Sequence, residues 1–230
     1  MSTRRCIVSF ANKNGNYIKG LARLGESLRN NFNGEFLGFI GEQSMGCPLH
    51  SAMPYAFKIH AIQKAIDAGF DQILWLDSSC FAIKNVNSIF DTIEKDGFIF
   101  QEAGHMLGTW TNDKTLKYFN LTRDEAMNIR MVGNAGFLGL NLRNPTAKQF
   151  FIRWKKACQD GMFAGAWTND GSESKDERCK GHRHDMSCSS ALVHTMGLSE
   201  LIKPGNEILQ YAGLYDETLN DTIIFKAQGL

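Results

Sequence analysis

The chain has 230 residues, of which 43% are hydrophobic and 21% charged, and its formal net charge is +1 at pH 7. This length and apolar fraction suit one α/β domain whose core is large enough to fold without disulfides. The near-neutral charge provides no basic field for nucleic acid or an anionic membrane, and no apolar run is long enough to span a bilayer. The N-terminus leads into a strand rather than a signal sequence, and the six cysteines are scattered, so we expect a reducing, cytoplasmic setting.

The first 40 residues carry the pattern of a strand, a helix and a second strand. Residues 5–10 and 35–40 are rich in apolar and β-branched side chains, and between them the leucines on one helical face are Leu21, Leu24 and Leu28. Such a unit predicts a parallel sheet. The polar turn at 11–16 contains no GxGxxG or GxxxxGK[ST] pattern, which argues against a Rossmann dinucleotide site or a P-loop.

The next helix precedes the most informative strand of the chain. Pro54 opens this helix in the favoured first-turn position, and its buried stripe consists of Ile59, Ile62 and Ile66. Lys58 lies near the helix start, where a lysine opposes the helix dipole and would suit a phosphate or a carboxylate. The alternative, a lysine that simply faces solvent, is the more common situation.

A wholly apolar run over residues 73–76 ends at Asp77 and is followed by Ser78 and Ser79. This pattern predicts a strand buried on both faces, whose last residues lie at the C-terminal edge of an open sheet. Ligands of α/β proteins bind at that edge. An aspartate there can hold a divalent cation, and the cation can hold a diphosphate. The structural alternative is that Asp77 only caps the following turn.

Two later stretches contain local structural signals. The segment 132–140 has three glycines, which usually mark a close approach of the backbone. Asn134 and Ala135 are therefore expected beside the ligand bound at the sheet edge next to Asp77. Residues 122–125 have the sequence of a capping box, and this explains them without any chemistry.

Residues 161–181 break the pattern with a charged, turn-rich sequence, and we interpret them as a mobile surface loop that acts as a lid. The adjoining segment supplies Cys179, His182, His184 and Cys188, which are two sulfurs and two nitrogens as in structural zinc sites. The spacing is unusual for zinc, and Cys188 is expected to face the core of its helix. Polar loop histidines without a metal are the other interpretation.

Four segments follow one another in a particular order: Pro54-Tyr-Ala-Phe-Lys58, Leu74-Trp-Leu-Asp-Ser-Ser79, Asn134-Ala-Gly-Phe-Leu138 and His184-Asp-Met-Ser187. This order resembles the GT-A glycosyltransferases, the nucleotide-sugar-dependent class that includes glycogenin-like enzymes, and it is similar to small virus- or phage-encoded glycosyltransferases. In such families a lysine-bearing helix precedes a strand that ends in a DxD-type motif; an "NAG" strand and an "HDQ"-like helix start follow. The resemblance covers most of the chain. It implies a single GT-A-like α/β domain over residues 1–230, with a mostly parallel central sheet flanked by helices.

The resemblance also implies a donor site and a metal. Asp77 and Ser79 would occupy the DxD positions, where Ser79 replaces the second carboxylate. The donor-binding residues that it implies are Ala11, Asn12, Tyr17, Lys58, Asp77, Ser78, Ser79, Asn134 and Ala135. The metal would be Mn²⁺ (or Mg²⁺), held by Asp77 and Ser79 at the DxD positions. The candidates in this chain for additional histidine ligands are His182 and His184. Histidine ligands would favour manganese.

The activity implied is transfer of a sugar from a nucleotide-diphosphate donor, which we expect to be a UDP-sugar, to a hydroxyl acceptor. Asp185 is the carboxylate expected to stabilise the oxocarbenium-like anomeric carbon or to deprotonate the acceptor. Its structural alternative is a helix N-cap. The sequence leaves open whether the acceptor is a glycan, a protein or a modified base.

Two rival functions share the same sheet. A sugar-nucleotide pyrophosphorylase usually carries a glycine-rich, basic phosphate loop after the first strand, and residues 11–16 lack it. A catalytically silent nucleotide-sugar-binding module is the other rival, in which Ser79 marks the loss of the metal. Turnover of a donor sugar would distinguish an enzyme from this module.

Overall fold

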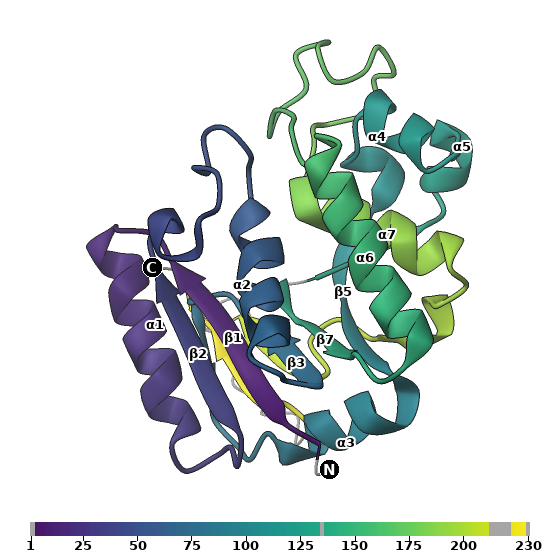
Figure 1. Cartoon of the computed structure of the whole chain (residues 1–230). Coiled ribbons are helices and arrows are strands. Elements are labelled where there is room, and N and C mark those ends of the chain that lie inside the picture. Colours follow the sequence, from purple (N-terminus) through teal and green to yellow (C-terminus); the bar gives the residue numbers. More distant parts are fainter. Residues whose placement is uncertain (1–2, 134–135, 212–221, 229–230) are drawn as a thin grey trace.

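The computed structural model describes residues 3–133, 136–211 and 222–228 (Figure 1). A seven-stranded sheet lies at its centre, and helices cover both faces. The strands of this sheet are β1 (Arg5–Ala11), β2 (Glu35–Ile40), β3 (Gln72–Trp75), β5 (Phe98–Met106), β6 (Arg130–Val132), β7 (Leu138–Asn141) and β8 (Ile202–Lys203). The α-helices are α1 (Gly15–Leu28), α2 (Ala56–Asp67), α3 (Asn87–Asp96), α4 (Asp113–Tyr118), α5 (Arg123–Ala126), α6 (Pro145–Gln159) and α7 (His184–Thr195). Short 3₁₀ turns are η1 (Glu42–Met45), η2 (Leu107–Thr109) and η4 (Ser199–Leu201).

The strand order is β2-β1-β3-β7-β5-β6, with β8 beside β5. β1 pairs in parallel with β2 and β3, and β8 pairs in parallel with β5. β7 runs antiparallel to both β3 and β5, and β6 runs antiparallel to β5. Five of the seven strands therefore share one direction, and the prediction of a mostly parallel sheet flanked by helices is confirmed.

Side chains of the β3 segment alternate between two cores. Ile73 and Trp75 pack in the core that also contains residues of α2, α6 and α7. Leu74 and Leu76 pack in the core on the opposite face, with residues of α1 and α3. Because helices cover both faces, no position from 73 to 76 faces solvent, as the unbroken apolar run predicted. Each such side chain contributes roughly 1.5–3 kcal/mol through burial.

A small second sheet brings the C-terminal part of the chain next to the residues that follow β3. It consists of β4 (Cys80–Ala82), β10 (Phe225–Ala227) and β9 (Leu209–Tyr211), in that order. After β10, the backbone N–H of Gln228 donates to the carbonyl of Ser79 at 3.1 Å. The Gln228 side chain accepts a hydrogen bond from Arg23 at 2.8 Å. The Ser79 carbonyl also accepts a hydrogen bond from Arg23 at 2.7 Å, so the segment that follows β3 is held by α1 and by the residue after β10.

Several local predictions are confirmed, and one is wrong. The leucines of α1 are buried, and the capping box has both its hydrogen bonds, between Thr122 and Glu125. Helix α2 begins at Ala56 rather than at Pro54, because Tyr55 has a left-handed backbone (φ 60°) that a helix cannot continue through. Residues 161–181 contain no helix or strand, as expected; their mobility stays a prediction. In the described part of the chain, no helix has the length and apolarity needed to cross a membrane.

Candidate functional site

The predicted polar residues meet at the C-terminal edge of β1 and β3. These strands are adjacent and parallel, so the residues that follow them emerge on the same side of the sheet. A cavity of about 390 Å³ opens there, and its lining consists of Phe10, Asn12, Tyr17, Glu42, His50, Tyr55, Phe57, Asp77, Ser78, Ser79 and Gln228. The predicted donor-binding residues that the structure brings together in this lining are Asn12, Tyr17, Asp77, Ser78 and Ser79.

The other predicted donor residues have different positions. Ala11 is fully buried, and its carbonyl accepts a hydrogen bond from the Gly41 N–H at 2.9 Å. Asn134 and Ala135 lie outside the described residues. Gly136, directly after them, has φ +73°, and a Cβ built on it would lie 2.3 Å from Asp77 Oδ1. The glycine-rich segment therefore approaches Asp77 closely at Gly136, in agreement with the predicted close approach of the backbone.

An aromatic wall completes the cavity, and of its residues only Tyr17 was predicted from the sequence. The Phe10 and Phe57 rings stack with centroids 4.3 Å apart, and the His50 and Tyr55 rings lie 4.9 Å apart. Tyr17 is 44% exposed at the cavity. Flat aromatic faces suit a nucleobase or a sugar ring. The available signal was the alternation of Tyr55 and Phe57 immediately before Lys58.

Lys58 is buried beside this cavity, so the solvent-exposed alternative is wrong. Its Nζ lies 2.8 Å from Asp185 Oδ2 and 3.4 Å from Asp77 Oδ1, and its side chain is 3% exposed. The rings of Tyr55 and Trp75 lie 5.2 and 5.8 Å from the same nitrogen. Burial lowers the pKa of Lys58, but the two carboxylates outweigh it and raise the pKa above its ordinary value. The ammonium is therefore charged.

Asp185 is the second residue of α7, and its carboxylate does not cap the helix. The N-cap is Arg183, and no side chain caps the helix there. The Asp185 carboxylate pairs with Lys58 instead, so the capping alternative is wrong. Burial raises the pKa of Asp185; Lys58 opposes the rise and Asp77 adds to it. One ammonium shared by two carboxylates leaves one negative charge in excess.

Two strained residues precede the side chains of this ion cluster. Tyr55 (φ 60°) precedes α2, and His184 (φ 49°) begins α7; both have left-handed backbones that non-glycine residues rarely adopt. Their rings stack with centroids 5.3 Å apart. Strain of this kind concentrates at functional sites. The two helices that carry Lys58 and Asp185 therefore begin against each other.

Comparison with known proteins identifies the architecture. No protein-family model and no curated protein matches the sequence. A solved structure described as the WbbM bifunctional glycosyltransferase matches with a TM-score of 0.55 at 9% identity, covering 99% of this chain. A glycosyltransferase involved in glycosylation of the major capsid of PBCV-1 also matches with a TM-score of 0.55, at 12% identity, covering 97% of this chain and 92% of its own. The chain has a glycosyltransferase fold. It spans 46% of the length of the first of these proteins.

Within this glycosyltransferase fold, the predicted metal ligands do not meet at one point. His182 is fully buried; its Nε2 lies 2.9 Å from the Met162 carbonyl, and its Nδ1 accepts from the Asn112 N–H at 3.4 Å. His184 Nδ1 lies 2.8 Å from the Phe163 carbonyl, and its buried Nε2 has no hydrogen-bond partner. Over residues 3–133, 136–211 and 222–228, no group of three or more His, Cys, Asp or Glu side chains is arranged to hold a metal ion.

The zinc alternative is wrong for the same reason. The Cys179 sulfur lies 3.5 Å from the Thr111 carbonyl, and the Cys188 sulfur lies 3.5 Å from the Met162 carbonyl. Both cysteines are buried, and their contacts are to different parts of the backbone. The expectation that Cys188 faces the core is confirmed.

The charge of the cavity decides whether a metal fits it. The carboxylates in its lining belong to Glu42 and Asp77, and this lining of described residues contains no lysine or arginine. A diphosphate entering the cavity would therefore meet negative charge, which a divalent cation would neutralise. Asp77 and Ser79 supply too few ligands for a six-coordinate ion. A metal fits here only if diphosphate oxygens and water complete its shell.

Proposed function

We propose that this chain transfers a sugar from a nucleotide-diphosphate donor, a UDP-sugar, to a hydroxyl acceptor. The observation that carries the proposal is the ammonium of Lys58 between Asp77 and Asp185, next to an aromatic-walled cavity at the C-terminal edge of the sheet. Ligands bind at this edge in open α/β sheets. The aromatic wall suits the base, and the polar residues after β3 suit the diphosphate and the sugar.

The chemistry follows from where charge develops. Cleavage of the bond between the sugar and the phosphate places negative charge on the leaving diphosphate. A divalent cation at Asp77 would neutralise that charge, and the buried Lys58 ammonium, 3.4 Å from Asp77 Oδ1, holds this carboxylate in position. The anomeric carbon becomes oxocarbenium-like. We propose Asp185 as the carboxylate that stabilises this carbon or takes the acceptor proton, because its raised pKa brings it closer to the range in which a general base works.

The metal in this proposal is Mn²⁺ or Mg²⁺. Asp77 and Ser79 would hold it together with donor oxygens, and when bound it would supply Lewis-acid stabilisation of the diphosphate. His182 is not proposed as a ligand, because both of its ring nitrogens already have partners. His184 is not proposed either, since no metal-holding group forms around it among the described residues.

Thermal stabilisation by UDP, GDP and CMP, each with and without Mn²⁺, tests the donor site without a known acceptor. We expect UDP with Mn²⁺ to raise the melting temperature of the wild type. The rise should disappear in Asp77→Ala, a variant in which Lys58 keeps its closer partner Asp185. An unchanged response in Asp77→Ala would contradict the assignment.

Turnover separates an enzyme from a silent binding module. Release of UDP from a UDP-sugar in the wild type, with a large loss in Asp185→Asn and nearly unchanged binding of UDP, is the expected result. If Asp185→Asn loses stability but keeps its turnover, the role of Asp185 is structural. If UDP binds and no UDP-sugar is ever consumed, the module is the correct interpretation.

A further inference from the structure

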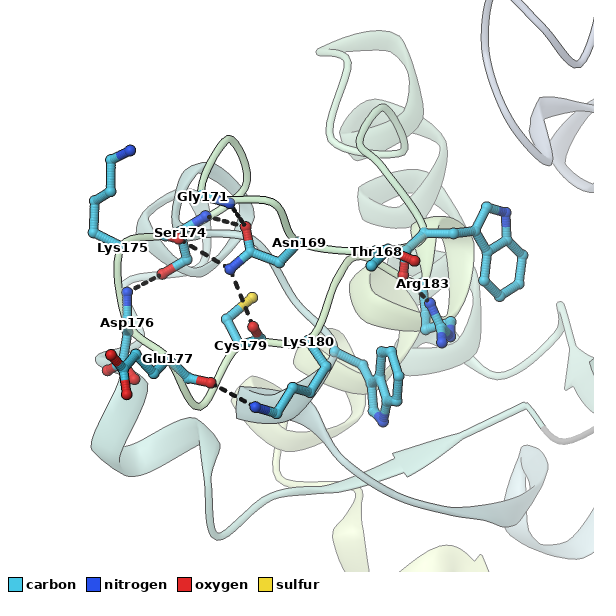
Figure 2. Close-up of a pocket in the computed structure, with 12 residues that line it drawn as sticks. Thr168, Asn169, Gly171, Ser174, Lys175, Asp176, Glu177, Cys179, Lys180 and Arg183 are labelled. Atoms are coloured by element: carbon cyan, nitrogen blue, oxygen red, sulfur yellow. Dashed lines mark hydrogen bonds between the residues drawn. The ribbon is translucent and has the colours of Figure 1, made fainter.

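A second cavity has a volume of about 760 Å³, and Figure 2 shows the residues that line it. Its lining shares no residue with the first cavity. It lies between the segment 168–180, the indoles of Trp110 and Trp167, and the guanidinium of Arg183. None of the residues in the proposed donor site belongs to it, so it is an additional site.

The aromatic part of the second cavity is held by contacts to Arg183. The Arg183 guanidinium lies 3.6 Å from the Trp110 ring centroid and 4.3 Å from that of Trp167. It also donates a hydrogen bond to the Trp167 carbonyl at 2.8 Å (Figure 2). Gly181 has no room for a Cβ, which would lie 2.0 Å from this same carbonyl oxygen. Trp167 is nonetheless 50% exposed, so a fixed indole is presented to an incoming ligand.

The polar part of the cavity is also preorganised. The Asn169 amide donates to the carbonyls of Ser174 and Cys179 at 3.0 and 3.1 Å, and its oxygen accepts from the Gly171 N–H at 2.9 Å (Figure 2). Lys180 donates to a backbone carbonyl of the same segment at 2.8 Å. A site whose groups are already ordered loses less entropy when a ligand binds.

The chemistry of this lining selects a neutral, polyhydroxylated ligand. Apart from the two indoles it contains no large apolar side chain, which makes it a poor pocket for an apolar peptide side chain or a lipid. Its charged side chains are of both signs: Lys175, Lys180 and Arg183 against Asp176 and Glu177. The C–H face of a sugar ring packs on an indole, while its hydroxyls bond to the charged side chains of the lining.

Aromatic residues in the linings of the two cavities contact each other. Tyr55 lines the first cavity and Trp167 the second, and their ring centroids are 6.3 Å apart. The His184 ring lies 5.3 Å from each of them. A molecule bound to Trp167 is therefore close to the Tyr55 ring, and the Lys58 ammonium, which pairs with Asp185, lies 5.2 Å from the centroid of that ring.

We propose that the second cavity binds the acceptor and that the acceptor is a carbohydrate. This inference rests on the proposed function, in that the bound sugar receives the transferred one. A hydroxyl oxygen of the acceptor bonds to the anomeric carbon of the donor, the bond from that carbon to the diphosphate oxygen breaks, and its electron pair leaves with the diphosphate. The hydroxyl proton passes to Asp185.

The test measures the two cavities separately. Binding of a panel of methyl glycosides (glucoside, galactoside, mannoside, xyloside and rhamnoside, both anomers) is followed by saturation-transfer NMR and titration, with UDP and Mn²⁺ present and absent. We expect at least one glycoside to bind, and Trp167→Ala to weaken it about tenfold. Trp167→Phe should retain most of the binding, and Ile152→Ala, a 48% exposed residue of α6 outside both linings, should change nothing.

The outcomes distinguish this inference from the proposed function. If UDP still stabilises Trp167→Ala while glycoside binding is lost, both stand. If no glycoside of the panel binds, or if Trp167→Ala binds them as the wild type does, the acceptor inference is overturned although the donor site stands. If glycosides bind and UDP with Mn²⁺ never does, the cavity is a carbohydrate site and the proposed transfer is wrong.

Discussion

Substitution of Lys58 by methionine removes the positive charge at the centre of the ion cluster while keeping an unbranched side chain. The wild-type ammonium is 3% exposed and lies 2.8 Å from an Asp185 carboxylate that is 6% exposed. Asp185 would be left buried and without its cation. Removing one partner of a buried pair in this way costs about 3–5 kcal/mol.

The structure also predicts an asymmetry within the cluster. In Asp185→Leu, Lys58 keeps Asp77, whose carboxylate is 36% exposed and 3.4 Å away. This variant should therefore lose less stability than Lys58→Met. The double variant Lys58→Met/Asp185→Leu buries no unpaired charge and should lose less than Lys58→Met alone, because an apolar pair of similar volume often replaces a buried ion pair at little cost.

Urea unfolding at pH 7, followed by the fluorescence of the buried Trp75 and Trp154, measures all four proteins. A loss of 3–5 kcal/mol is a large part of the ~5–15 kcal/mol that stabilises a typical domain. If Lys58→Met does not fold, the double variant still tests the reasoning, because it is expected to fold. The reasoning is refuted if Lys58→Met costs less than about 1 kcal/mol, or if the double variant loses the sum of the two single losses.

Two other substitutions probe the groups around this cluster. Burial lowers the pKa of His182 to about 3, whereas the unfolded chain keeps a value near 6.5, so the unfolded state takes up the proton first as pH falls. The free energy of unfolding should therefore decrease below about pH 6.5, and His182 should account for about 2 kcal/mol of this decrease at pH 5. The His182→Gln variant should lack this contribution. Equal pH dependence of the wild type and the variant would contradict the prediction. Gly136→Ala should weaken binding of UDP with Mn²⁺ about tenfold or more, because its Cβ would lie 2.3 Å from Asp77 Oδ1. Gly104→Ala is the matched control, with φ +72° and open space around the added carbon; similar affinities in the two variants would show that Gly136 does not position Asp77.

Much of the fold follows from local patterns. The apolar run before Asp77 predicts a strand buried on both faces, and the leucine stripe of α1 predicts which face of that helix is buried. The insertion of β7 between β3 and β5 could not be predicted in this way, because it depends on pairings between distant segments. The small sheet was missed because its strands have three residues each, too few for a period to be visible.

The candidate site was also predicted only in part, because local patterns do not show contacts between distant segments. Asp77 follows a recognisable strand, so its position at the sheet edge could be inferred from sequence. Lys58 could not be told from a solvent-exposed lysine, because its burial depends on Asp185, which comes from a different helix much later in the chain. The histidines were predicted to be metal ligands by residue type alone, whereas their partners are backbone carbonyls that a sequence pattern does not show.

The charge balance of the ion cluster predicts that the diphosphate and the divalent cation bind cooperatively, which no single sequence motif predicts. Lys58 neutralises one carboxylate, and the remaining negative charge lies at a cavity whose lining adds Glu42 and contains no basic side chain. A diphosphate alone is repelled there, and a cation alone finds too few ligands at Asp77 and Ser79. Each supplies what the other lacks, so the two should bind cooperatively. In the UDP and Mn²⁺ titrations, the stabilisation by both together should exceed the sum of the separate effects, and simple additivity would mean that the diphosphate is bound away from Asp77.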